Sequence, residues 1–284
     1  MKKRFLAIFL TVGMFCNFAP MNANAEEPTE QISGDFSYVA YEDHAEITGF
    51  ATEDDTHPLE TVQIPAEIDG LPVTSIGKFA FWKDEFSGVI LPDTLTSIGV
   101  QAFGNCQNLT EIEFPASLTS VGNGAFGSSG LKEVHIPETI TDFGENIFFS
   151  CVDLETAELP DNMTVIPNGI FQKCHSLKHI DLPEHTTVIG EEAFGGCWAL
   201  ENIVIPESVT TLGLCCFSSC IGLEEVTIPK SVTEIGDSIF MNCTGLKRVN
   251  FSGNVKDISF GMFAFSGIEE ITFSETVESV SCSL

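Results

Sequence analysis

Basic residues are scarce in this sequence. Lys and Arg number 12 against 41 Asp and Glu, which gives a formal net charge of −29. Nucleic acids and anionic membranes are bound through clustered Lys and Arg, so this deficit opposes both as partners. The excess of carboxylates indicates an acidic, solvated surface that keeps the chain soluble.

Long hydrophobic runs are also missing. The longest near the N-terminus extends from Phe5 to Phe15, about half of the roughly 20 residues that a spanning helix needs. Lys2, Lys3 and Arg4 precede it, and an A-x-A pattern ending at Ala25 follows it. This arrangement predicts a secretory signal peptide over residues 1–25, so we expect export and no membrane insertion after cleavage.

What the sequence does have is a unit of 22–23 residues that repeats along most of the chain. The unit at Ile205–Leu223 reads IPESVTTLGLCCFSSCIGL, and the next reads IPKSVTEIGDSIFMNCTGL. An apolar residue followed by Pro marks the units from Ile64-Pro65 to Ile228-Pro229, and degenerate copies follow at Phe251 and Phe273. Such a period predicts a solenoid, in which each unit buries its apolar side only against its neighbours.

Each unit divides into three parts. Leu-x-x-Val-x-Ile-Pro predicts a short strand with one buried face, ended by a Pro that has no N–H to donate. V-T-x-I-G predicts a return strand followed by a bend at Gly, and x-x-A-F-x-x-C predicts a single helical or 3₁₀-like turn. All units run in the same sense, so the strands stack in parallel and the coil is right-handed. We therefore expect about nine to ten rungs, a rung being one turn of the coil.

Phe occupies one position in every unit. The chain has 24 Phe but only 2 Tyr and 2 Trp, as expected for a dry core that has no place for a polar ring substituent. The ladder predicted from this position serves packing rather than ligand binding. It consists of Phe103, Phe126, Phe148, Phe171, Phe194, Phe217, Phe240 and Phe263.

The chain has 10 cysteines, a number that in an exported protein suggests disulfides. Six of them share the repeat position three residues after Phe, where stacked side chains point the same way rather than at each other. We therefore expect free buried thiols that pack as small apolar groups. Cys215 and Cys282 fall at surface-like positions. The six are Cys106, Cys151, Cys174, Cys197, Cys220 and Cys243.

The two ends differ from the repeats. Residues 26–63 lack the period, and two strand patterns around a polar turn at Glu42–His44 predict a β-hairpin that caps the solenoid of residues 64–284. The last rung is incomplete, because Val277–Cys282 begins a return strand and stops. An uncovered last rung would expose apolar residues, so we expect end-to-end self-association.

The variable, exposed residues of the first strands form the candidate partner-binding face. It is acidic toward the N-terminus and more neutral further on. Side chains on a flat strand face do not point toward a common centre, as the ligands of a metal ion must. Carboxylates open to water also lack the dry cleft that acid–base catalysis requires. We therefore predict no catalytic residue, no metal and no cofactor. The face comprises Glu111, Glu113, Glu133, His135, Glu158, His179, Asp181, Asn202, Glu225 and Arg248.

The motif I-P-x-S-V-T-x-I-G-x-x-A-F-x-x-C-x-x-L resembles the leucine-rich repeats of the BspA-like surface proteins of bacteria. The resemblance covers the chain from Ile64 onward, with a matching preface at Leu59–Phe81. It implies a curved leucine-rich repeat solenoid, secreted or on the bacterial cell surface. It also implies an adhesin-like role, in which the concave strand face recognises a protein or glycan on host or microbial surfaces. The alternative is a structural spacer, or the repeat portion of a larger surface protein with no ligand of its own.

Overall fold

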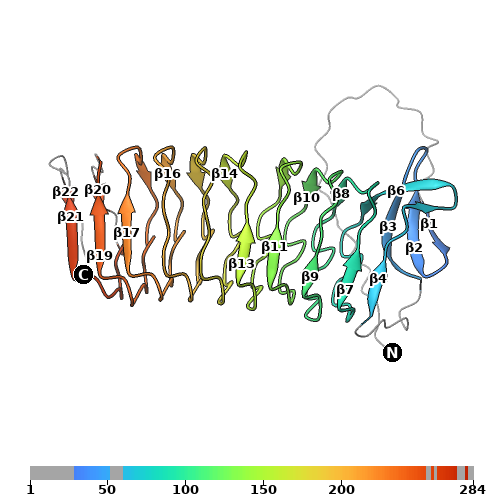
Figure 1. Ribbon diagram of the computed structural model, residues 1–284, viewed down its shortest axis with the longest axis horizontal. Helices are drawn as coiled ribbons and strands as arrows, with labels where there is room; N and C mark the ends of the chain where they lie inside the picture. The colour runs from blue at the N-terminus through green and yellow to red at the C-terminus, as the bar shows by residue number, and fades with distance from the viewer. Residues whose placement is uncertain (1–28, 52–59, 254–256, 259–260, 274–278, 281–284) are drawn as a thin grey trace, which may run out of the picture.

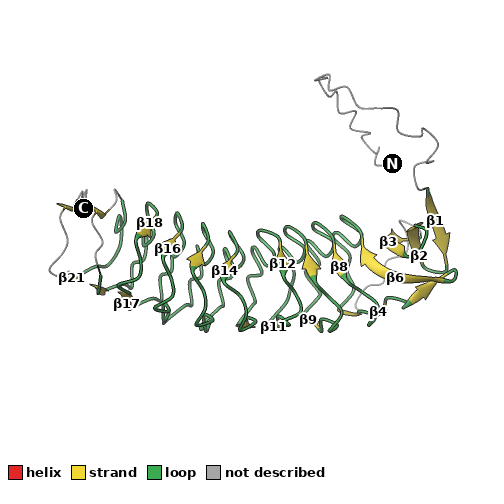
Figure 2. Cartoon of the chain, turned by 90° about the horizontal axis from the view of Figure 1, so that it is seen from above, coloured by secondary structure: helices red, strands yellow, loops and turns green. Residues whose placement is uncertain are grey.

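The chain folds into an elongated solenoid in which successive rungs stack side by side (Figure 1). The computed structural model describes residues 29–51, 60–253, 257–258, 261–273 and 279–280. Every strand in it is short, and its described residues contain no helix (Figure 2). This architecture confirms the predicted leucine-rich repeat solenoid with parallel strands and return strands.

The first strands of the rungs form one side of the coil. Their register is parallel wherever they pair; for example, Val226 lies opposite Val249 and then Ile271. Buried and exposed residues alternate, so that every second side chain enters the core. These strands are β4 (Thr61–Gln63), β7 (Gly88–Ile90), β9 (Glu111–Ile112), β11 (Glu133–His135), β13 (Thr156–Glu158), β17 (Glu225–Ile228), β19 (Arg248–Phe251) and β21 (Glu270–Phe273).

The return strands form a second ladder. In one sheet, neighbouring strands pair in the order β6-β8-β10-β12. In another sheet, the order is β14-β15-β16-β18. The strands are β6 (Leu71–Ile76), β8 (Ser97–Ile98), β10 (Ser120–Val121), β12 (Asp142–Phe143), β14 (Val165–Ile166), β15 (Val188–Ile189), β16 (Thr211–Leu212), β18 (Glu234–Ile235), β20 (Asp257–Ile258) and β22 (Ser279–Val280).

Antiparallel strands precede the first rung. β1 (Glu30–Ser33) pairs with β2 (Phe36–Ala40), β2 pairs with β3 (Ala45–Phe50), and β3 continues into the return ladder through a parallel pairing with β6. β5 (Glu67–Ile68) folds back antiparallel on β6. Phe36 and Phe50 lie against Phe81, the first ring of the Phe ladder, with ring centroids 6.4 and 5.1 Å away. The predicted domain boundaries and capping role stay predictions, and most of the predicted incomplete last rung lies outside the described residues.

The predicted single helical or 3₁₀-like turn is not confirmed, because the third side of each rung is a series of tight turns. Ala102 and Gly104 donate to carbonyl oxygens three residues back, at 3.2 and 3.1 Å. Just before them the backbone enters the left-handed region at Gln101 (φ 51°), and just after them it does so again at Asn105 (φ 62°), which no α-helix or 3₁₀-helix allows. Positive φ recurs two residues before and after Phe in all nine units from Phe81 to Phe263.

The reason for this conformation is stacking. The N–H of Phe103 donates to the Ala125 carbonyl oxygen of the next rung at 2.8 Å, and the N–H of Gln101 donates to Asn123 at 2.9 Å. In a helix these groups would bond within their own segment. The alternation of negative and positive φ turns these N–H groups toward the next rung instead. This side of the coil is therefore also a hydrogen-bonded ladder.

The core is a column of stacked Phe rings. From Phe81 to Phe263, neighbouring ring centroids lie 5.3–5.9 Å apart and the rings are within 22° of parallel. All the rings except the last are almost completely buried. Offset stacking of this kind adds to the free energy of burial, and the predicted ladder is confirmed.

The six core cysteines are free and buried, as predicted. Each thiol also donates a hydrogen bond that sequence reasoning missed. Cys174 Sγ lies 3.2 Å from the carbonyl oxygen of Phe148 on the preceding rung, and the other five make the same contact at 3.0–3.2 Å. Burial raises the pKa of Cys151 to about 11 and that of Cys106 to about 12. Cys215 is partly exposed, and Cys282 lies outside the described residues.

Replacing a ring in the middle of the column tests its importance. Phe171→Ala removes a fully buried side chain that stacks on two neighbours, and we expect it to lower the free energy of unfolding by about 3–5 kcal/mol. The matched control is Phe265→Ala, whose ring is 80% exposed and should change it by no more than about 0.5 kcal/mol. Urea denaturation followed by circular dichroism measures both. Equal effects would show that the column does not dominate stability.

Thiol reactivity tests the state of the cysteines. Alkylation requires the thiolate, and burial raises the pKa of the six core thiols, so they should stay unmodified at pH 8 until denaturant is added. Partial burial and then the nearby Glu192 raise the pKa of Cys215, so its alkylation should increase with pH. Peptide mass spectrometry after iodoacetamide treatment reads each site. Rapid native labelling of Cys174 would contradict the buried position.

Candidate functional site

All ten residues predicted for the partner-binding face are exposed on the first-strand side. The alternation in β11 and β13 explains why: Val134 and Ala157 enter the core, and the residues on either side of them face solvent. Because the outward side chains do not contact the core, they vary from rung to rung without cost to packing. Whether they bind a partner stays a prediction.

The structure brings five of these residues together. Glu111, Glu113, Glu133, His135 and Glu158 line a hollow of about 670 Å³ across β7, β9, β11 and β13. The hollow also reaches Thr61, Gly88 and Thr156. His135 lies opposite Glu158 in the strand register, and their Nδ1 and Oε2 atoms are 2.6 Å apart. Four of the five side chains are carboxylates, so the hollow has a strongly negative rim.

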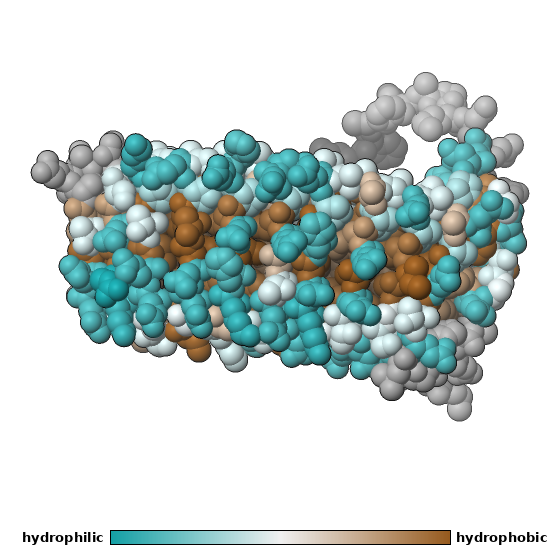
Figure 3. All heavy atoms as spheres, viewed as in Figure 1, coloured by the Kyte–Doolittle hydropathy of each residue, from teal (hydrophilic) through white to brown (hydrophobic). Residues whose placement is uncertain are grey.

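A second hollow, of about 540 Å³, adjoins the first and shares His135 and Glu158 with it. Asp181 is a further predicted residue in its lining. Apolar residues that end the strands supply the rest of its surface, among them Leu159-Pro160 and Leu182-Pro183. Figure 3 shows an apolar band along this side of the molecule with hydrophilic side chains on both margins. The arrangement offers a partner carboxylates beside an apolar strip.

The remaining predicted residues lie apart from the two hollows. His179 pairs with Asp181 within one rung, with Nε2 and Oδ1 3.0 Å apart. Arg248 Nη2 and Nε donate to Oε2 of Glu225 at 2.8 and 3.1 Å, and this contact raises the pKa of the Arg248 side chain. Asn202 is exposed on a rung that has no assigned first strand. Six of the ten residues therefore line the two hollows and His179 contacts one of them, whereas Asn202 and the pair Glu225–Arg248 lie outside this group.

Sequence reasoning missed some surface features. The strand-ending Leu-Pro positions were interpreted only as strand termini, although Leu159-Pro160 and Leu182-Pro183 also line the second hollow, where Leu159 is half-buried and the other three residues are buried. Trp198 is 48% exposed on the turn side and stacks on His175 with ring centroids 3.6 Å apart. The scarcity of Trp was interpreted only as a sign of a core without polar rings. The signal for an exposed Trp198 was its position directly after the core residue Cys197.

The described residues contain neither a metal-binding cluster nor a membrane-spanning helix. No group of three or more His, Cys, Asp or Glu side chains there could hold a metal ion. None of the described segments is a helix long and apolar enough to cross a bilayer.

Comparison with known proteins identifies the repeat. The BspA type leucine rich repeat region matches residues 74–197 and 164–284 in 6 copies, which is more than half of the chain. A leucine-rich repeat protein from Bacteroides ovatus is 25% identical with a TM-score of 0.70, over 92% of this chain and 78% of that one. The pneumococcal vaccine antigen PcpA shares the fold at 16% identity and a TM-score of 0.50, over 89% of this chain and 90% of its own. No curated protein matches. The chain belongs to the BspA-type leucine-rich repeat family.

Proposed function

We propose that this protein is a secreted or cell-surface, non-catalytic binding protein of the adhesin type, which recognises a protein or glycan through its first-strand face. The observation that carries the proposal is the pair of adjoining hollows that share His135 and Glu158. They combine a solvent-exposed acidic rim with a largely buried apolar lining.

The chemistry of the hollows favours particular ligands. Carboxylates accept hydrogen bonds from Lys and Arg side chains and from sugar hydroxyl groups. Leu159, the half-buried member of the apolar lining of the second hollow, would contact an apolar side chain or the C–H face of a sugar ring. A basic protein surface and a hydroxyl-rich glycan are therefore the two classes that the face would recognise.

Two further features support export and the absence of catalysis. Residues 1–25 carry the pattern of a secretory signal peptide, and they lie outside the described residues. General acid catalysis requires a carboxyl group in a dry environment that raises its pKa. Glu111, Glu113, Glu133, Glu158 and Asp181 are all exposed to water.

The second candidate function is a structural spacer without a ligand of its own. It is favoured by the internal pairing of charges on this face, such as His135 with Glu158, Lys178 with Glu155 and Arg248 with Glu225. Exposed pairs of this kind contribute little to stability, but they keep the face solvated and soluble.

Charge reversal separates the two functions. We expect Glu158→Lys combined with Asp181→Lys to abolish capture of the partner, because it places cations where the ligand needs acceptors. Immobilised mature protein would be tested against host and microbial surface fractions and against a glycan array. The matched control, Glu191→Lys with Glu234→Lys, makes the same change of net charge at exposed positions outside the two hollows. Identical binding by both variants and the unmodified protein would refute recognition through this face.

A further inference from the structure

The return ladder is held together by two regular backbone hydrogen bonds per rung. In six rungs between β8 and β18, the Gly after the return strand donates its N–H to the preceding rung at 2.7–2.9 Å, as Gly144 does to Val121, and the Thr before the strand donates at 2.7–3.0 Å, as Thr141 does to Thr119. The Gly donors are Gly99, Gly122, Gly144, Gly190, Gly213 and Gly236; the Thr donors are Thr96, Thr119, Thr141, Thr187, Thr210 and Thr233.

Among the rungs of β6 to β18, one breaks this rule. Pro167 stands where the other rungs of this part have Gly, and Pro has no N–H to donate to the Phe143 carbonyl oxygen. Close stacking also requires the absence of a Cβ: one built on Gly144 would lie 2.4 Å from the Asn123 nitrogen, and one on Gly190 would lie 2.6 Å from the Ile166 oxygen. Because Pro carries both a Cβ and a ring, this rung cannot approach its neighbour as the others do.

The ladder is consequently interrupted between β12 and β14. β12 ends one sheet and β14 begins the next, with no pairing between them. Thr141 and Thr187 each donate their N–H to the preceding rung. Within the described part of the chain, the N–H of Thr164 makes no such backbone hydrogen bond. Two strand edges therefore face each other with unused backbone groups.

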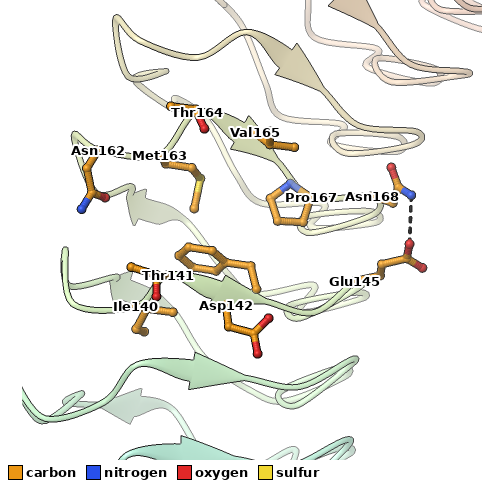
Figure 4. A pocket seen from close by; sticks show the side chains of 11 residues that line it. Ile140, Thr141, Asp142, Glu145, Asn162, Met163, Thr164, Val165, Pro167 and Asn168 are labelled. Carbon is orange, nitrogen blue, oxygen red and sulfur yellow. Dashed lines mark hydrogen bonds between the residues drawn. The ribbon is translucent and has the colours of Figure 1, made fainter.

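The interruption is confined to this wall of the solenoid. On the same two rungs, β11 pairs with β13, Phe148 N donates to Ile170 at 3.0 Å, and Phe148 stacks on Phe171. Side chains hold both ends of the opening. Asn168 Nδ2 donates to Glu145 Oε1 at 3.0 Å, as the dashed line in Figure 4 shows, and Asn162 Nδ2 donates to the Glu138 carbonyl oxygen at 2.9 Å. Side-chain hydrogen bonds thus bridge both ends of the opening.

The opening is a cleft of about 540 Å³, here named the Pro167 cleft, with an apolar interior. Met163 and Pro167 point into it (Figure 4), and Phe143 and Ile140 also line it. Val165, 48% exposed, stands in its lining. The charged residues of the lining are Asp142 and Glu145, and none of the lining residues is basic.

We propose that the Pro167 cleft binds an extended segment of a partner polypeptide that carries an apolar side chain between basic residues. Its backbone would pair with the open edges of β12 and β14, the mode by which a peptide adds a strand to an exposed sheet edge. Its apolar side chain would enter the cleft beside Phe143 and Met163. Flanking Lys or Arg would pair with Asp142 and Glu145, so charge complementarity selects a cationic peptide. This site is separate from the first-strand face and does not depend on the function proposed for it.

The test uses Pro167→Gly, which restores the residue type of the other rungs. Gly supplies an N–H that can donate to the Phe143 carbonyl oxygen, and it removes the Cβ and ring of Pro167. We therefore expect the ladder to close and the midpoint of thermal unfolding to stay equal or increase. The probe is the peptide fluorescein-Gly-Gly-Lys-Val-Leu-Val-Lys-amide, and fluorescence polarisation measures its binding. We expect the unmodified protein to bind it at least about tenfold more tightly than the folded Pro167→Gly variant.

Control molecules identify the contacts. Pro206→Gly changes a strand-ending Pro outside the cleft and should bind like the unmodified protein. A peptide with alternate N-methylated amides, or one with Glu in place of Lys, should bind at least about tenfold more weakly. Hydrogen exchange at the Thr164 amide should slow when the peptide is bound. Absence of binding by the unmodified protein, or equal affinity of Pro167→Gly or of the N-methylated peptide, would overturn the proposal.

Discussion

Backbone hydrogen bonding between successive rungs is the constraint on which the rest of this molecule depends. It acts on the first strands, on the return strands and on the turn side, so nearly every position of the repeat stands above its own copy. Such stacking allows few residue types. The bend after the return strand needs Gly, because a Cβ at Gly122 or Gly236 would lie within 2.7 Å of the preceding backbone. The turn side tolerates positive φ at Asn105 and Asn242, a residue type that adopts it readily.

The same constraint explains the core. Rings at one repeat position form a continuous column once the rungs are in register, and the thiol three residues later reaches the Phe carbonyl of the preceding rung. A side chain there must be small, apolar in most of its surface and able to donate one weak hydrogen bond, and Cys meets all three conditions. Ser129 occupies the equivalent position, and its Oγ lies 3.2 Å from Cys151 Sγ.

The sequence was sufficient to predict what repetition determines. The period predicts the solenoid, the alternation around Val134 predicts which side chains face outward, and the shared Cys position predicts free thiols. It failed on the turn side, because a Phe and Cys spaced three apart suit a helical turn as well as two β-turns with positive φ. The distinction lies in hydrogen bonds to the next rung, such as Phe103 to Ala125, and a single unit does not contain them. The hollows also depend on several rungs at once: Gly88, Glu111 and Glu133 come together only after stacking.

Residues that obey the repeat contribute to the coil, so specificity must come from those that do not. On the first-strand side the outward positions are free of the packing constraint, and their charges differ from rung to rung. On the return side Gly follows every strand from β8 to β18 except β14, and Pro167 departs from that pattern with a loss of two ladder hydrogen bonds. Local departures that weaken a fold are expected where a protein has a function to perform. The loss at Pro167 is not offset within its own wall: β12 and β14 stay unpaired, and the frame from Glu138 to Asn168 keeps them so. A partner strand would supply the missing hydrogen bonds, and for this reason the break in the repeat is a better candidate for recognition than any position that repeats.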